Sequence, residues 1–216
     1  MAESGSPRPF PTWLKVAATV FVAVLVPVYG KRYGPANFLW FSDIALFLTV
    51  AALWLESKLL VSIAAVGTML LEIGWNIDFV LQLTGKIHYF GLSDYMLDPG
   101  IPVFVRALSL FHVPLPFLWL WMLHRLRYDR RAVVIQTIFA WIVLPATFAL
   151  GPRENVNWVY GFGPEPQRYM PPWSHLLLLM VLFPTLVYMP SHLLLTKLFP
   201  PRPPTARNKA AKSSKA

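Results

Sequence analysis

Hydrophobic residues along this chain fall into six long runs that are separated by short polar stretches. A helix that crosses the ~30 Å hydrocarbon core of a bilayer needs about 20 mostly apolar residues, and each run is close to that length. Strands of a membrane barrel would instead alternate apolar and polar residues over about ten positions. The pattern therefore predicts an all-α bundle of about six transmembrane helices, at residues 13–30, 36–55, 59–83, 103–123, 132–150 and 173–198.

The two ends of the chain differ from these runs. Residues 1–12 are polar and rich in proline, and residues 200–216 are basic and lack an apolar face. We expect a short N-terminal segment, one transmembrane domain over residues 13–199, and a disordered tail. The first run is not followed by a clear small-residue cleavage site, so we expect it to persist as a helix rather than act as a signal peptide.

Composition supports the assignment to a membrane. Hydrophobic residues make up 56% of the chain and charged residues 13%, about half the charged share of an ordinary soluble domain. The absence of cysteine excludes disulfides, cysteine-based zinc sites and thiol nucleophiles. The net charge is +9, but the basic residues form no patch with interleaved aromatic residues, so we do not expect a nucleic-acid partner.

The distribution of lysine and arginine predicts the orientation. With the amino terminus in the cytoplasm, thirteen of these residues lie in the inner segments and five in the outer loops. The positive-inside rule then favours cytoplasmic positions for both termini. We expect a multi-pass protein of the plasma membrane, or of the inner membrane if the source is bacterial.

Polar side chains interrupt three of the predicted helices, where they are costly in lipid and usually face the bundle interior. At 1.5 Å per residue, Asp43, His112 and Glu72 lie roughly 10, 13 and 17 Å below the outer surface. We therefore expect one polar cluster in the outer half of the membrane. Its candidate members are Asn37, Trp40, Ser42, Asp43, Glu72, Asn76, Asp78, Arg106, Ser109 and His112.

His112 is followed by Val113-Pro114-Leu115-Pro116. Each proline removes a backbone donor, so the sequence predicts a kink that frees the carbonyls of Leu110 and His112. A kink beside a buried imidazole opens space for a ligand, and imidazole can transfer protons near neutral pH. Both a catalytic and a structural role are open for His112.

Structural interpretations stand beside the functional ones for the other polar residues. Arg106 could pair with one of the intramembrane acids to join helices, and asparagine side chains commonly form interhelical hydrogen bonds. His192 is interpreted as structural. The outer loops at 87–102 and 151–173 could form a lid or lie as ordered interfacial loops. No metal-binding spacing such as HExxH is present, so we expect no metal and no cofactor.

Three short motifs resemble a known family. FLWFSDIALFL, SLFHVPLPFLWL and NVNWVYG occur in an order similar to that of the androgen-induced type of six-helix lipid hydrolase, related bacterial membrane proteins and a membrane phospholipid acyltransferase. The resemblance implies a nucleophile in the second helix, a catalytic histidine at His112, and acyl-ester lipids as substrates. The threonine of the hydrolases falls closest to Trp40, whereas the register of the acyltransferase cysteine places Ser42 there.

The leading hypothesis is a lipid acyl-ester hydrolase or acyltransferase with membrane lipids as partners. Ser42 would attack the ester, His112 would take the proton, and a carboxylate such as Asp43 would orient the imidazole. Further contacts to substrate are expected from Asn37, Trp40, Glu72, Asn76, Asp78 and Arg106. The alternatives are a non-catalytic protein that binds or transports a small molecule or lipid, and a structural subunit.

Overall fold

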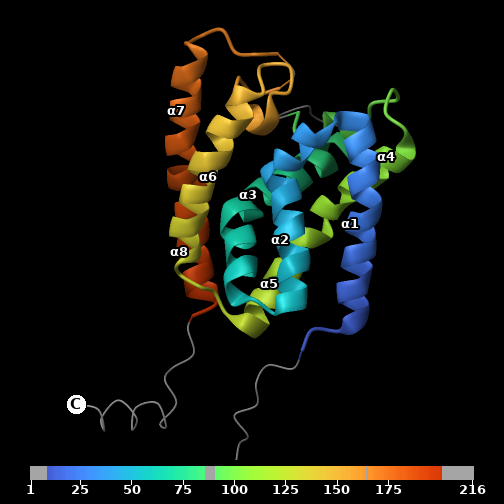
Figure 1. Ribbon diagram of the computed structural model, residues 1–216, viewed down its shortest axis with the longest axis vertical. Helices are drawn as coiled ribbons and strands as arrows, with labels where there is room; N and C mark the ends of the chain where they lie inside the picture. The colour runs from blue at the N-terminus through green and yellow to red at the C-terminus, as the bar shows by residue number, and fades with distance from the viewer. Residues whose placement is uncertain (1–8, 86–90, 164, 201–216) are drawn as a thin grey trace, which may run out of the picture.

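The computed structural model describes residues 9–85, 91–163 and 165–200, and it confirms an all-α fold with six helical passages (Figure 1). No β-strand occurs in these three ranges. Five of the passages are long and apolar enough to cross a membrane, and the shorter α2 is the sixth. The passages are α1 (Thr12–Tyr33), α2 (Phe41–Leu55), α3 (Lys58–Leu83), α4 to α5 (Val103–Leu126), α6 (Ala132–Ala149) and α7 to α8 (Pro172–Leu198).

Successive passages run in opposite directions, so the first and last helices begin and end at the same end of the bundle (Figure 1). We call this the termini end. The opposite end, called the loop end, carries the short helices η1 (Pro35–Leu39), η2 (Asp94–Met96) and η4 (Val156–Trp158). The cytoplasmic position of the termini end remains a prediction from charge, and the tail from residue 201 onward lies outside the described residues.

The second passage is shorter than its hydrophobic run suggests. Pro35 opens the η1 turn, and Trp40 has an extended backbone with φ −60° and ψ 135°. The α-helix therefore begins at Phe41 and not at residue 36, because the extended residue changes the direction of the chain. This break places Ser42 in the first turn of α2, where backbone amides have no partner within the helix.

The fourth passage is broken where its prolines predict a kink. It consists of α4 (Val103–Leu108), the 3₁₀ turn η3 (Ser109–His112) and α5 (Pro114–Leu126). Pro114 cannot donate to the Leu110 carbonyl, which instead accepts a hydrogen bond from the Val113 amide at 3.0 Å. The tighter turn satisfies one of the two carbonyls that the prolines leave without a helical donor.

The sixth passage contains another proline that alters the helix. Pro184 lies in a π-helical segment, η5 (Phe183–Tyr188), between α7 (Pro172–Leu182) and α8 (Met189–Leu198). It cannot donate to the Met180 carbonyl, and the indole Nε1 of Trp141 in α6 donates to that carbonyl at 2.8 Å. A side chain from a neighbouring helix thus replaces a missing backbone donor, as the hydrocarbon core of a membrane requires.

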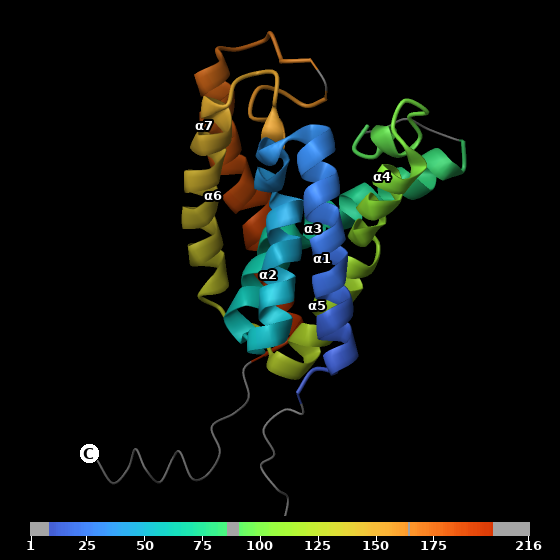
Figure 2. The ribbon, with the colours of Figure 1, turned by 45° about the vertical axis from the view of Figure 1, so that its right-hand side comes forward.

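Helix α3 is the centre of the bundle and packs against α2, α5, α6, η5 and α8. Every residue from Val61 to Met69 is buried, so the first half of α3 is covered on all sides. The second half exposes Ile73, Ile77 and Val80 and inclines away from α7 (Figure 2). The bundle is therefore closed toward the termini end and more open beside α3 toward the loop end.

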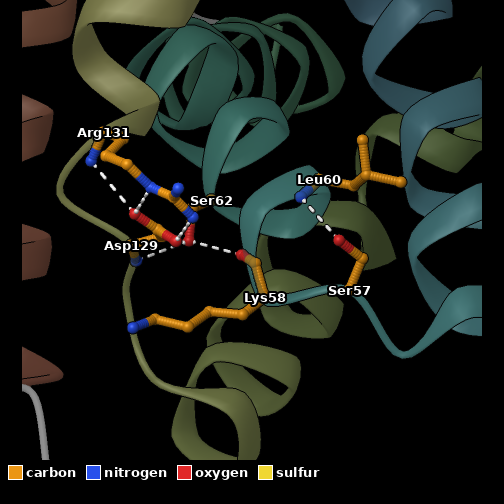
Figure 3. Close-up of polar contacts among 6 residues, drawn as sticks. All are labelled: Ser57, Lys58, Leu60, Ser62, Asp129 and Arg131. Atoms are coloured by element: carbon orange, nitrogen blue, oxygen red, sulfur yellow. Dashed lines mark hydrogen bonds and ion pairs between the residues drawn. The ribbon is translucent and has the colours of Figure 1, made fainter.

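Hydrogen bonds at the termini end join the turn between α5 and α6 to the first turns of α3 (Figure 3). The Ser62 hydroxyl donates to the Lys58 carbonyl at 2.7 Å and accepts from the Asp129 amide at 2.9 Å. Arg131 donates from Nη2 to Oδ2 of Asp129 at 2.9 Å. The hydrogen bonds from the Arg131 side chain, and then from its backbone amide, lower the pKa of the Asp129 carboxyl below its ordinary value of 3.8.

Replacing Asp129 by Asn tests this contact. A depressed pKa means that the ionised carboxylate stabilises the fold above its unfolded-state pKa and that this stabilisation disappears as the pH falls through the folded-state value. We expect Asp129→Asn to lose at most about 1 kcal/mol near pH 7, since Arg131 is exposed. Thermal unfolding in detergent should show a difference from wild type that shrinks below about pH 4. Glu154→Gln, at an exposed acid, is the control; a difference that grows at low pH would contradict the assignment.

Candidate functional site

A cavity of about 260 Å³ lies in the half of the bundle nearer the loop end, between α2, α3, η3, η4 and η5. Its wall is mostly apolar, with tryptophan and phenylalanine rings from every one of these elements except η3. They are Trp40, Phe41, Trp75, Trp158, Phe162 and Phe183. Among the polar residues on the wall are Ser42, Glu72, His112 and Asn157. The cavity therefore presents a few polar groups within an apolar surround, which is typical of a ligand site.

Glu72 and His112 form the polar centre of this cavity. Glu72 Oε2 lies 2.6 Å from His112 Nδ1, and both side chains are buried. An ionised carboxylate only accepts hydrogen bonds, so beside ionised Glu72 the imidazole carries its proton on Nδ1 and keeps Nε2 as its basic nitrogen. Trp75 stacks on the imidazole with ring centroids 4.5 Å apart. Glu72 and Trp75 together hold the ring in one orientation.

Asn76 fixes the backbone at His112. Pro116 cannot donate to the His112 carbonyl, and Asn76 Nδ2 donates to that carbonyl at 2.8 Å. The same nitrogen donates to the Glu72 carbonyl at 2.8 Å. Asn76 does not line the cavity; its side chain forms a bridge between α3 and η3, and the substrate contact expected of it stays a prediction.

Asn157 holds the start of α2 from a distant part of the chain. Its Oδ1 accepts from the Phe41 amide at 3.0 Å, and its Nδ2 donates to the Leu39 carbonyl at 2.9 Å. Trp40, at the N-cap of α2, makes no capping hydrogen bond with its side chain, so Asn157 supplies the cap. Its left-handed backbone, φ 56°, suits asparagine better than most residues.

Hydropathy gives no sign of this role for Asn157. The residue lies in a polar loop between predicted helices, and its presence in NVNWVYG is the only signal in the sequence. The loop also contributes Trp158 and Phe162, and Trp158 packs edge-on against Trp40 with centroids 5.3 Å apart. Part of the 151–173 loop therefore forms one side of the cavity wall, and both interpretations of the loop, as a lid and as an ordered interfacial loop, stay open.

Asp43 lies beside the cavity but does not orient His112. It is buried, and its Oδ2 accepts from Asn37 Nδ2 at 2.9 Å. Among the described residues, its Oδ1 has no hydrogen-bond partner. Asp43 and Asn37 are absent from the cavity wall, and the carboxylate at the imidazole is that of Glu72. The expected contact between Asp43 and His112 is corrected accordingly, because the first turn of α2 directs Ser42 and not Asp43 to the cavity.

Asp78 and Arg106 also lie outside the cavity wall. Asp78 Oδ2 accepts from the amide and the hydroxyl of Ser93, at 2.8 and 2.7 Å. Arg106 Nη1 donates to the Met96 carbonyl at 2.7 Å. Within the described part of the chain, no ion pair joins Arg106 to Asp43, Glu72 or Asp78. Both residues therefore attach the loop around η2 to the bundle, and the structural alternative in which Arg106 pairs with an intramembrane acid is not the arrangement seen.

The two histidines of the sixth passage each contact a residue from another part of the chain. His175 Nε2 lies 3.0 Å from the Trp158 carbonyl, and His192 Nδ1 lies 2.9 Å from the Tyr128 hydroxyl. The structural interpretation of His192 agrees with this contact. In the described ranges, no three His, Cys, Asp or Glu residues are grouped as metal ligands would be.

Substituting Asn157 tests its part in the site. Asn157→Ala removes the cap of α2 and places alanine at a positive φ, which together should cost about 1–2 kcal/mol. We expect a lower unfolding temperature in detergent. Asn157→Asp separates the two contacts, because it keeps an acceptor for the Phe41 amide and tolerates the left-handed backbone but loses the donor to the Leu39 carbonyl. Glu154→Gln, at an exposed acid of the same loop, is the control. Unfolding of the alanine variant at the wild-type temperature would show that the contact contributes nothing.

No protein-family model, no curated protein and no solved structure matches the chain. The function is therefore inferred from two features of the structure. They are the membrane-type helical bundle and the buried Glu72–His112 pair.

Proposed function

We propose that this chain is a membrane enzyme that transfers or hydrolyses acyl groups of lipid esters. The observation that carries the proposal is the 2.6 Å contact between Glu72 Oε2 and His112 Nδ1, in a cavity that Ser42 also lines. A hydroxyl nucleophile, an imidazole base and a carboxylate that orients the base are the groups that acyl transfer needs.

Each residue has a definite role in the proposed reaction. The Ser42 hydroxyl gives its proton to Nε2 of His112 as its oxygen attacks the ester carbonyl. Glu72 stabilises the imidazolium that results, and the imidazolium then protonates the departing alcohol. A water or an acceptor alcohol that enters by the same route attacks the acyl-serine and regenerates Ser42. The first case is hydrolysis and the second is transfer.

The start of α2 supports stabilisation of the oxyanion. Ser42 is the second residue of the helix, and the amides of Ser42 and Asp43 belong to the first turn, where no carbonyl within the helix accepts their hydrogen bonds. The positive end of the helix dipole adds to their effect on a developing negative charge. Arg106 lies outside the cavity wall, so it does not stabilise the oxyanion in the proposed reaction.

The surroundings of the pair favour a lipid ester over a water-soluble one. The third, fourth and sixth passages, which all contribute to the cavity wall, are of membrane-spanning length, and the wall is dominated by aromatic and aliphatic side chains. An ester carbonyl linked to a hydrocarbon chain suits such a wall, because the chain gains from burial while the carbonyl meets the polar groups.

Labelling with an alkyl fluorophosphonate tests the proposal directly. We expect the purified chain to be labelled at Ser42, and we expect Ser42→Ala to abolish both the label and the hydrolysis of phospholipid and acylglycerol esters. His112→Gln and Glu72→Gln should lower the rate of labelling by about 10²-fold or more, since both act on proton transfer.

Ser174→Ala is the matched control, because Ser174 also lies toward the loop end but outside the cavity wall. Retention of label and turnover in Ser42→Ala would contradict Ser42 as the nucleophile. Absence of both label and turnover in the wild-type chain would contradict the enzyme and favour the alternative, a protein that binds or transports a small molecule or lipid without chemistry.

A further inference from the structure

Gly74 lines the cavity at a position where neither helix geometry nor packing requires a glycine. It lies in the interior of α3, where glycine is the least favourable residue apart from proline. Among the residues that the structure describes, a Cβ atom built at this position would approach only Leu92 Cδ1, at an ordinary contact distance of 3.9 Å. By contrast, a Cβ at Gly67 in the same helix would meet Gln136 Nε2 at 2.6 Å. Packing accounts for Gly67, but it does not account for Gly74.

The position of Gly74 on its helix places it at the edge of the cavity. Leu70 and Gly74 are four residues apart, so they share one flank of α3, and both line the cavity. Ile73 and Ile77, on the adjoining face, are 40% and 51% exposed. The flank formed by Leu70 and Gly74 therefore separates the cavity from the outer surface of the bundle.

The opposite edge of the cavity is also open to that surface. Phe162, in the loop after η4, is 69% exposed while it lines the cavity, and Phe183 at the start of η5 lines it from the sixth passage. Toward the loop end, α3 inclines away from α7 (Figure 2). The cavity thus adjoins the lipid-facing surface at the side of the bundle, between α3 and the sixth passage.

We infer that Gly74 leaves room for one hydrocarbon chain of a membrane lipid, which enters sideways past α3 and lies along the wall toward Glu72 and His112. The cavity volume of about 260 Å³ is near the lower limit of pockets that bury a drug-sized ligand, so it suits one chain rather than a whole two-chain lipid. The residue at position 74 then determines which acyl chains fit. This inference rests on the proposed acyl transfer for its chemistry, but the chain site itself can be tested without it.

Two variants at position 74 distinguish a loss of cavity space from a loss of protein stability. Gly74→Ala improves the helix and adds one methyl group, so its unfolding temperature should equal or exceed that of wild type while the cavity shrinks. Gly74→Leu fills the opening with an isobutyl group. Ala23→Leu, at an exposed position of α1 away from the cavity, is the control for added bulk on the lipid-facing surface.

Two measurements are made on each variant. The first is the rate of labelling by a butyl and by a dodecyl fluorophosphonate. The second is the affinity for cis-parinaric acid, monitored by energy transfer from tryptophan. In Gly74→Leu we expect dodecyl labelling and parinaric acid affinity to fall by at least about tenfold, the effect of losing about two buried methylenes. Butyl labelling should stay near the wild-type rate, Gly74→Ala should lie between, and Ala23→Leu should behave as wild type.

Equal dodecyl labelling and equal parinaric acid binding in wild type and Gly74→Leu would overturn the chain site and leave the acyl transfer intact. If neither phosphonate labels wild type, the acyl transfer fails, and parinaric acid alone decides the chain site. Weaker binding in Gly74→Leu then supports the site, whereas unchanged or absent binding overturns it.

Discussion

The hydrogen bond from Asn76 to the His112 carbonyl is the contact on which the rest of the site depends. Lipid provides no donors, so every carbonyl that a proline leaves without its helical donor must find one inside the protein. Pro116 leaves the carbonyl of His112 without its helical donor. Asn76 donates to this carbonyl across the interface between α3 and η3. The bond allows the fourth passage to break where the imidazole projects, and it also brings that break against the helix that carries Glu72.

The Glu72–His112 pair is stable in this position because each partner compensates for the burial of the other. A lone carboxylate in an apolar interior is expensive to desolvate, and a charge-assisted hydrogen bond recovers much of that cost. Glu72 Oε2 lies 2.6 Å from Nδ1, within hydrogen-bond distance. The same bond determines which nitrogen of the imidazole can accept a proton, so one contact serves both the packing of the bundle and the proposed chemistry.

Two features outside the polar pair give the cavity its form. Asn157 caps α2 and thereby sets where Ser42 lies, and Gly74 keeps the flank of α3 open beside exposed Ile73. Asn157 adds hydrogen bonds to the start of α2, whereas Gly74 has no side chain to fill the cavity edge. Together they place Ser42 and the flank of α3 at the same cavity, as the proposed acyl transfer requires.

The amino-acid sequence alone determined the six helical passages and the break at His112, because hydropathy and proline act over a few neighbouring residues. It also indicated that polar groups from three helices would lie at similar depth. The tertiary structure alone decided that Glu72 rather than Asp43 meets His112, that Asn76 is a bridge, and that Asn157 caps a helix over a hundred residues away. Those outcomes depend on the rotation and tilt of each helix, which side-chain packing between distant segments sets and no local pattern records.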